Sequence, residues 1–345
     1  MRVLATSRER LRVDGEVTWR VPSLSLPETE ATVDQIAESE AVQLFVERAR
    51  LVRPEFRPDE QSHTAVSHLC RRLDGIPLPI ELAAARLSVL TVEQIDERMS
   101  DALRLLTGGS RSAPTRHQTL RATLDWSHNL LSLPEQVTLR RLAVFAGGWT
   151  IEAAESVIAG EAVARQEVFD LVSALIERSL VQVEHGGGFV RYRLQETVRQ
   201  YARDHLDRSN ETTAIQERHA EYFTALADVI EPAMRGAEQV QWAARCDADL
   251  ENLRAALAWV CADGRTELGL RLGWGLWRYW QLRGYGIEAR HWLRGILELP
   301  TGGASRELRT GVLFAAARNA LLLGETADAM ALAQSCLIAA RAFDD

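Results

Sequence analysis

The side chains that could carry out chemistry in this chain are arginines, carboxylates and a few histidines, because the 345 residues include no lysine. A P-loop of the form G-x-x-x-x-G-K-[ST] needs its lysine to neutralise the β- and γ-phosphates of a nucleotide. The chain therefore contains no P-loop. The patterns H-E-x-x-H, G-x-S-x-G and C-x-x-C do not occur either, so no metalloprotease, hydrolase or redox dithiol is indicated.

Two groups of polar residues could imitate a site. Asp125, Ser127 and His128 are close in sequence, but a catalytic triad is defined by geometry across a fold, so we expect surface and capping groups here. His63 and His68 are five residues apart, off the i, i+4 face that a helical metal pair needs. We predict neither a catalytic residue nor a metal site.

The composition indicates an ordinary globular protein, with 46% hydrophobic residues, a net charge of −8 and a pI near 5.6. This charge disfavours non-specific binding to nucleic acid or to an anionic membrane. The four cysteines form no close pair, which favours reduced thiols. The N-terminus lacks the apolar run of a signal peptide, and no 18 consecutive residues are apolar; we expect a cytoplasmic protein.

Short strands are predicted at residues 2–6 and 16–22, and helices follow. From Ser39 the apolar residues repeat with a helical period up to Pro54, and further helices are expected at about 66–73, 79–87 and 92–106. The strands resemble the last strands of a parallel sheet whose earlier strands are missing. The helices are expected to form a cluster that closes at Gly108-Gly109.

A linker rich in turn-forming residues, 108–114, precedes helices expected at about 120–131, 135–145, 151–158 and 167–179. Residues 180–194 (LVQVEHGGGFVRYRL) alternate on both sides of three glycines, which indicates a β-hairpin. Helices followed by such a hairpin predict a winged-helix fold.

Beyond Asp207 every segment is predicted to be helical. The segments near Gly284 and Gly324 match at a spacing of 40 residues, which resembles tetratricopeptide helix pairs. We expect the repeat array to continue in a longer parent protein. Six of the nine tryptophans lie between Trp242 and Trp292; they could line a groove for an effector, but a seam between repeat helices is the more frequent use of such a stripe.

Taken in order, VLATSRE, GIPLPIELAAARL, the winged helix and YRLQETVRQYA resemble the NB-ARC class of STAND signalling ATPases, and especially large bacterial transcriptional regulators that carry helical repeats. The resemblance covers almost the whole chain. It implies a mainly α fold: a remnant of the α/β nucleotide-binding domain, a helical lid, a winged helix and a repeat domain that is incomplete at its C-terminus. These four segments are expected at residues 1–34, 35–109, 115–210 and 213–345.

The resemblance also implies nucleotide-binding residues. The family's sensor arginine, which contacts the γ-phosphate, corresponds to Arg8, and guanidinium groups suit phosphate because they form paired hydrogen bonds. The G-[IL]-P-L motif corresponds to Gly75 through Leu78, with Pro77 against the adenine ring; the alternative is a plain connection between helices. The family's Met-His-Asp motif corresponds to Leu194-Gln195-Glu196, where Gln195 can donate a hydrogen bond but carries no charge. This departure favours a structural strand-to-helix junction.

The phosphate-binding loop and the Mg²⁺-binding strand should lie upstream, so we expect ADP or ATP to bind only in a complete ATPase domain and no hydrolysis by this chain. Expected partners are the missing P-loop domain, a protein or small effector at the repeats, and other copies in an activated oligomer. Direct DNA contact by the winged helix is disfavoured, because residues 117–207 carry nine arginines against twelve acidic residues, although Arg191 and Arg193 on the wing favour it. A DNA-binding regulator and a non-catalytic adaptor or scaffold remain the alternatives.

Overall fold

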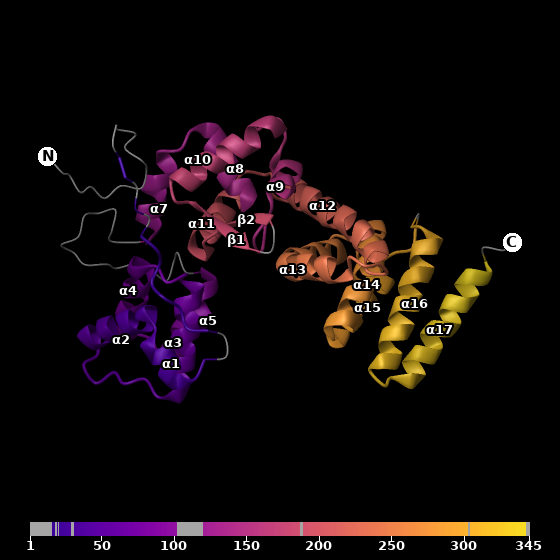
Figure 1. Ribbon diagram of the computed structural model, residues 1–345, viewed down its shortest axis with the longest axis horizontal. Helices are drawn as coiled ribbons and strands as arrows, with labels where there is room; N and C mark the ends of the chain where they lie inside the picture. Colours follow the sequence, from indigo (N-terminus) through magenta and orange to yellow (C-terminus); the bar gives the residue numbers. More distant parts are fainter. Residues whose placement is uncertain are drawn as a thin grey trace. The chain divides into compact units, whose positions relative to one another are not determined.

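The structure is a computed structural model that describes residues 16–17, 19, 21–28, 31–101, 120–186, 189–302 and 304–342 (Figure 1). Its secondary structure is mostly helical, and the strands of the described residues form one two-stranded sheet. The predicted mainly α fold is therefore confirmed. None of the described helices combines the length and the apolar character that a membrane span requires.

The chain divides into two compact units. The first contains residues 1–143, 160–184 and 192–209, and the second contains 144–159, 185–191 and 210–345. Both units draw residues from the predicted winged-helix segment, so their limits differ from the four predicted segments. Each unit is described separately below.

The first unit begins with a cluster that we call the lid helices: α1 (Val33–Glu38), α2 (Glu40–Val52), α3 (Glu60–Arg72), α4 (Pro77–Ala85), η1 (Arg86–Ser88), α5 (Val92–Glu97) and η2 (Arg98–Asp101). The helix predicted from Ser39 is α2; of the four residues expected on its core face, Ala41, Phe45 and Ala49 are fully buried and Leu44 is half-buried. The start of α3 is fixed by Asp59, which accepts a hydrogen bond from the Ser62 N–H at 2.9 Å. The predicted end at Gly108-Gly109 lies outside the described residues.

The strand predicted at 16–22 is wrong for the residues that the structure describes there, which adopt no regular structure. Val17, Trp19 and Val21 are 90%, 85% and 82% exposed. Alternation in sequence stabilises a strand only when a neighbouring strand accepts its hydrogen bonds and a core covers one face. The other predicted strand, at residues 2–6, lies outside the described residues.

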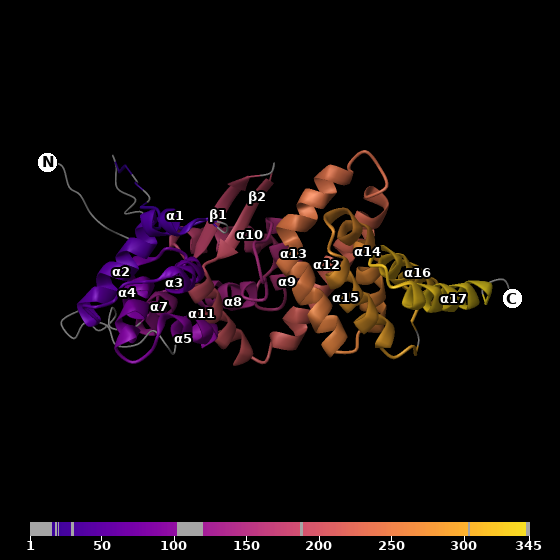
Figure 2. The ribbon, with the colours of Figure 1, turned by 90° about the horizontal axis from the view of Figure 1, so that it is seen from below.

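The remainder of the first unit contains α7 (Leu120–Asn129), α8 (Leu133–Leu142), η4 (Arg165–Glu167), α10 (Val168–Glu177) and α11 (Glu196–Asp207). Helix α8 packs against α10 and α11, and α7 packs against α11 and α4. The predicted hairpin is present as β1 (Val181–Gly186) paired with β2 (Phe189–Leu194) (Figure 2), and its residues from 185 to 191 are assigned to the second unit. Capping contributes at the start of α8, where the Ser132 N–H donates to Glu135 at 2.6 Å.

The second unit contains the short helix α9 (Ile151–Ile158), which packs on α12, and then the long helices. These are α12 (Thr212–Ala233), α13 (Gln239–Ala262), α14 (Thr266–Arg283), α15 (Gly286–Glu298), α16 (Arg306–Leu322) and α17 (Thr326–Arg341). Within this unit α16 and α17 lie side by side (Figures 1 and 2).

The 40-residue spacing is visible in the backbone of these helices. Gly284 ends α14 and Gly324 follows α16, and both have left-handed φ angles, 73° and 78°. Two members of the tryptophan stripe have the burial of a seam, since Trp277 and Trp280 are 4% and 1% exposed; the other four are half-buried. Helices α12 and α14 come close at Gly275, where a Cβ atom would lie 2.5 Å from the Ala227 carbonyl oxygen.

Candidate functional site

The residues singled out from the sequence lie in two segments of the first unit, and Arg8 lies outside the described residues. Gly75 lies in the connection between α3 and α4, Pro77 is the first residue of α4, and Gln195 lies between β2 and α11. The structure brings these two segments together through Asp74 and Glu196, the neighbours of Gly75 and Gln195. We call this contact the junction.

The connection between α3 and α4 requires glycine. Asp74 and Gly75 have φ angles of 53° and 65°, in the left-handed region. The Gly75 carbonyl accepts a hydrogen bond from the Leu24 N–H at 3.0 Å. A Cβ atom at Gly75 would lie 2.4 Å from the Leu24 carbonyl oxygen. Gly75 therefore provides both a left-handed turn and room for the chain segment that precedes the lid helices.

Pro77 is the first residue of α4, where a missing N–H costs nothing and a fixed φ angle favours helix initiation. Its ring is exposed, whereas Pro79, Ile80, Leu82, Ala83 and Ala84 behind it are buried. These positions agree with the plain helix connection. They also leave the ring accessible.

The carboxylate of Asp74 forms the junction. It accepts a hydrogen bond from the Glu196 N–H at 2.8 Å, and Arg193 lies 3.4 Å from its other oxygen. Its side chain is only 10% exposed, and this burial raises the pKa of the Asp74 carboxyl although the Glu196 N–H and Arg193 oppose the change. Sequence reasoning missed Asp74. The only available signal was an acidic residue directly before the glycine of a helix break.

Asp74 takes the capping role that Gln195 leaves open. Gln195 is the N-cap residue of α11 with an extended backbone (φ −60°, ψ 145°), and its side chain makes no capping hydrogen bond. The first N–H groups of a helix need acceptors, and a carboxylate there is favoured by the helix dipole. Gln200, one turn into α11, donates to the Met99 carbonyl at 3.2 Å and adds a second contact to the lid helices.

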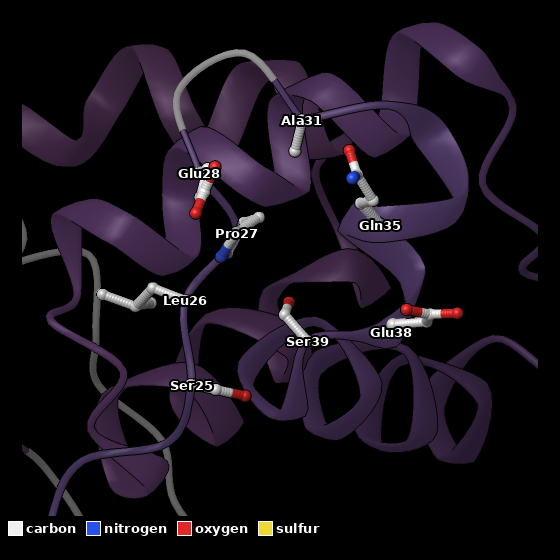
Figure 3. Close-up of a pocket in the computed structure, with 8 residues that line it drawn as sticks. All are labelled: Ser25, Leu26, Pro27, Glu28, Ala31, Gln35, Glu38 and Ser39. Carbon is white, nitrogen blue, oxygen red and sulfur yellow. The ribbon is translucent and has the colours of Figure 1, made fainter.

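A hollow of about 310 Å³ lies beside the segment that touches Gly75 (Figure 3). Its lining residues are Ser25, Leu26, Pro27, Glu28, Ala31, Gln35, Glu38 and Ser39. The Ser25 Oγ accepts from the Glu40 N–H, Gln35 accepts from the Thr32 N–H, and Ser39 donates to the Ile36 carbonyl. These polar groups already form hydrogen bonds with nearby backbone atoms. We therefore interpret the hollow as a surface depression between short elements and not as a ligand site.

The two arginines of the wing are both held by carboxylates. Arg193 lies 2.8 Å from Glu184 on β1 and also contacts Asp74. Arg191 belongs to the second unit, where it is 8% exposed, lies 2.8 Å from Asp249 and donates to the Gly148 and Ala248 carbonyls. Their side chains therefore do not form an open basic patch.

The remaining candidate residues also have structural partners. His68 lies 2.7 Å from Asp96, and the His63 ring contacts the Asp59 carbonyl at 2.9 Å. Asp125, Ser127 and His128 are not the surface and capping groups expected from the sequence. Ser127 is buried, Asp125 accepts a hydrogen bond from Tyr201 of α11, and His128 stacks on His205 of α11. In the described part of the chain, no group of three or more histidine, cysteine, aspartate or glutamate side chains could hold a metal ion.

Comparison with known proteins identifies a winged helix-turn-helix domain at residues 131–207. The chain is 42% identical over 296 residues to proteins of Mycobacterium tuberculosis and Mycobacterium bovis whose names describe HTH-type transcriptional regulators. That match covers 86% of this chain and 32% of each relative. An uncharacterised M. tuberculosis protein is 40% identical over 235 residues, 68% of this chain and 57% of the relative. The chain thus spans about a third of the length of the first relatives. No solved structure gives a significant match.

Proposed function

We propose that this chain is the regulatory part of a nucleotide-dependent switch of the STAND type that acts in transcriptional control. The winged-helix match and the names of the mycobacterial relatives support a role in regulation. The order of the GIPLPIELAAARL segment, the winged helix and the repeats supports the finer assignment to NB-ARC proteins. An effector at the repeats of the second unit would shift the equilibrium between a resting and an active state.

The observation that carries this proposal is the hydrogen bond between the Asp74 carboxylate and the Glu196 N–H, 2.8 Å long. It joins the two segments that the resemblance assigns to one nucleotide clamp, although they are 122 residues apart. In a switch of this kind the contact between lid and winged helix must be able to form and break. A partly exposed hydrogen bond between two elements suits that requirement better than a large apolar seam.

The described residues suit the adenine of a nucleotide better than they suit its phosphates. The exposed ring of Pro77 leaves an apolar surface that an adenine could cover. A phosphate at the start of α11 does not fit, because the Asp74 carboxylate already accepts the Glu196 N–H there and would repel an anion. Arg8 remains the proposed contact to a γ-phosphate. We propose that ADP or ATP binds only beside an upstream P-loop domain and that this chain alone does not hydrolyse ATP.

Direct DNA binding by the winged helix is the second candidate, favoured by the names of the mycobacterial relatives. Three observations oppose it. Arg191 is buried in an ion pair with Asp249. Arg193 forms an ion pair with Glu184. The exposed residues of α10 include Asp170 and Glu177, whose carboxylates would repel DNA phosphates. We therefore propose that the winged helix contacts protein, and that DNA contact is made elsewhere in a longer polypeptide.

Hydrogen–deuterium exchange with and without ADP tests the nucleotide proposal. In a longer natural protein that joins a P-loop domain to this chain, ADP should slow exchange in residues 74–77 by contact with the adenine, and in residues 195–200 by stabilising the junction without direct contact. The isolated chain should show no such change and no ATP turnover. Turnover by the isolated chain, or an absence of protection in the longer protein, would refute the proposal.

A salt titration of binding to duplex DNA tests whether the winged helix binds DNA directly. The purified chain should show no binding whose affinity falls steeply with salt concentration. A steep salt dependence that disappears in an Arg193→Ala variant would support the DNA-binding alternative instead.

A further inference from the structure

A cluster of aromatic and titratable side chains joins α7 to α11 in the first unit. The rings of His128 on α7 and His205 on α11 are stacked, with centroids 4.4 Å apart and an interplanar angle of 26°. Tyr201 lies against both imidazoles, at 4.6 Å from His205 and 5.7 Å from His128. The Tyr201 hydroxyl donates to Asp125 at 2.8 Å. We call these four residues the histidine clasp.

Stacked imidazoles are compatible with one another only while at least one is neutral, because two imidazolium rings at this separation repel. Two carboxylates near the clasp oppose this repulsion only in part: Asp125 keeps its charge while it accepts the Tyr201 hydrogen bond, and Asp204 is paired with Arg121 at 3.4 Å. Glu81, the acidic residue of the neighbouring helix α4, is paired with Arg48 instead.

The surrounding positive charges act in the same direction as the His–His repulsion. Burial lowers the pKa of His128, and His205 and Arg140 of α8 lower it further against the opposing effect of Asp125. Burial also lowers the pKa of His205, with Arg208 and Arg121 acting in the same sense and Asp125 and Asp204 opposing. Both imidazoles are therefore held in their neutral forms at neutral pH.

Helix α7 contacts both helices that flank the junction, so its attachment to α11 can stabilise the junction. It packs against α11, which Asp74 caps, and against α4, which begins at Pro77. The clasp joins α7 to α11, and so does the ion pair between Arg121 and Asp204. Release of α7 would remove one of the elements that connect the lid helices to α11.

We propose that the stacked pair of His128 and His205 is a proton-operated clasp, which holds α7 on α11 while the rings are neutral and releases α7 when both are protonated. The attachment itself does not depend on the proposed nucleotide switch. Only its consequence for signalling rests on that proposal, since release of α7 would favour an open lid.

The direction of the pH dependence follows from the lowered pKa values. Below the ordinary histidine pKa of 6.5, the detached helix takes up protons that the attached helix excludes. The free energy that holds α7 on α11 is therefore largest above pH 6.5, and it decreases as the pH falls toward the pKa values of the two clasp histidines. Each unit by which a pKa is lowered corresponds to about a tenfold change in the attachment equilibrium.

Hydrogen–deuterium exchange of α7 between pH 7.5 and 5.5, corrected for the intrinsic pH dependence of exchange, tests the clasp on the full chain. Wild-type α7 should lose protection at the lower pH, the direction expected for two histidines whose pKa values are lowered in the attached helix. A variant with both His128→Phe and His205→Phe keeps a stacked aromatic pair that cannot be protonated, so its protection should not change. His68→Gln is the matched control, because it removes a titratable histidine from the lid helices outside the clasp and should leave the wild-type response intact.

Proton NMR titration of the histidines gives a second measurement, and its main result, the titration of the wild-type rings, does not depend on the fold of the double Phe variant. The proposal requires two histidines that titrate below 6.5 and whose curves are coupled, with each curve shifted in the single variant that lacks the other ring. Wild-type α7 protection that is flat with pH, a double Phe variant that retains the response, or clasp histidines that titrate at or above 6.5 would each overturn the proposal. None of these measurements involves nucleotide or DNA, so their failure is distinct from failure of the proposed function.

Discussion

Substitution of Gly75 by alanine tests how the junction is built. Alanine at a φ angle of 65° costs about 1–2 kcal/mol, because the Cβ atom crowds the following carbonyl in the left-handed region. In addition, the new Cβ atom would lie 2.4 Å from the Leu24 carbonyl oxygen, which belongs to a backbone that cannot simply rotate away. Forced overpacking of this kind costs about a further 1–3 kcal/mol. The expected loss of stability is therefore about 2–5 kcal/mol.

Gly264 is a matched control for this substitution. Its φ angle is 72°, close to that of Gly75, but nothing lies within 4 Å of the Cβ atom that alanine would add. Gly264→Ala should cost only the conformational term of about 1–2 kcal/mol. Gly302, with neither a left-handed φ angle nor a near neighbour, should tolerate alanine with little change.

Urea unfolding combined with hydrogen exchange measures these costs separately in the two units. Exchange from α3 and α4 reports on Gly75, and exchange from α13 and α14 reports on Gly264. If Gly75→Ala costs no more than Gly264→Ala, the close approach of Leu24 to the lid helices is wrong. Gly75 would then be required only for its backbone conformation.

Three further predictions concern single side chains. Asp74→Ala removes the acceptor of the Glu196 N–H, so exchange at the start of α11 should accelerate by about fivefold, as expected for loss of a helix cap worth about 1 kcal/mol, while Asp74→Asn should retain most of the protection. Burial raises the pKa of Cys70 to about 12, so a thiol reagent at pH 8 should modify the partly exposed Cys336 well before Cys70, and equal rates in the native chain would contradict the described core. Arg193→Ala should weaken the junction without changing any affinity for duplex DNA, as measured by thermal unfolding and by a salt-titrated binding assay.

The helical elements were predictable because their signals are local. The spacing of Val66, Leu69, Cys70 and Leu73 placed one face of α3 in the core, and all four side chains are fully buried. The alternating runs around the three glycines identified β1 and β2. Alternation failed at residues 16–22, because a strand depends on partners that a sequence window does not contain.

The candidate site was only partly accessible to sequence reasoning. The patterns identified Gly75, Pro77 and Gln195 as positions of interest through a family resemblance, and the structure places them at the ends of α3, α4 and β2. Asp74 carried no motif of its own. The wing arginines looked available because their carboxylate partners, Glu184 and Asp249, could not be assigned from the sequence.

The absence of lysine, the helical periods and the glycines at turns are properties of the chain itself, and they determined by composition and local geometry that it has no P-loop and folds mainly as helices. Which charges meet was decided only by the tertiary structure. Asp74 reaches the start of α11, and His128 stacks on His205, because folding brings together residues that are 122 and 77 positions apart. Such long-range contacts depend on how whole helices pack, and no spacing along the sequence encodes them individually.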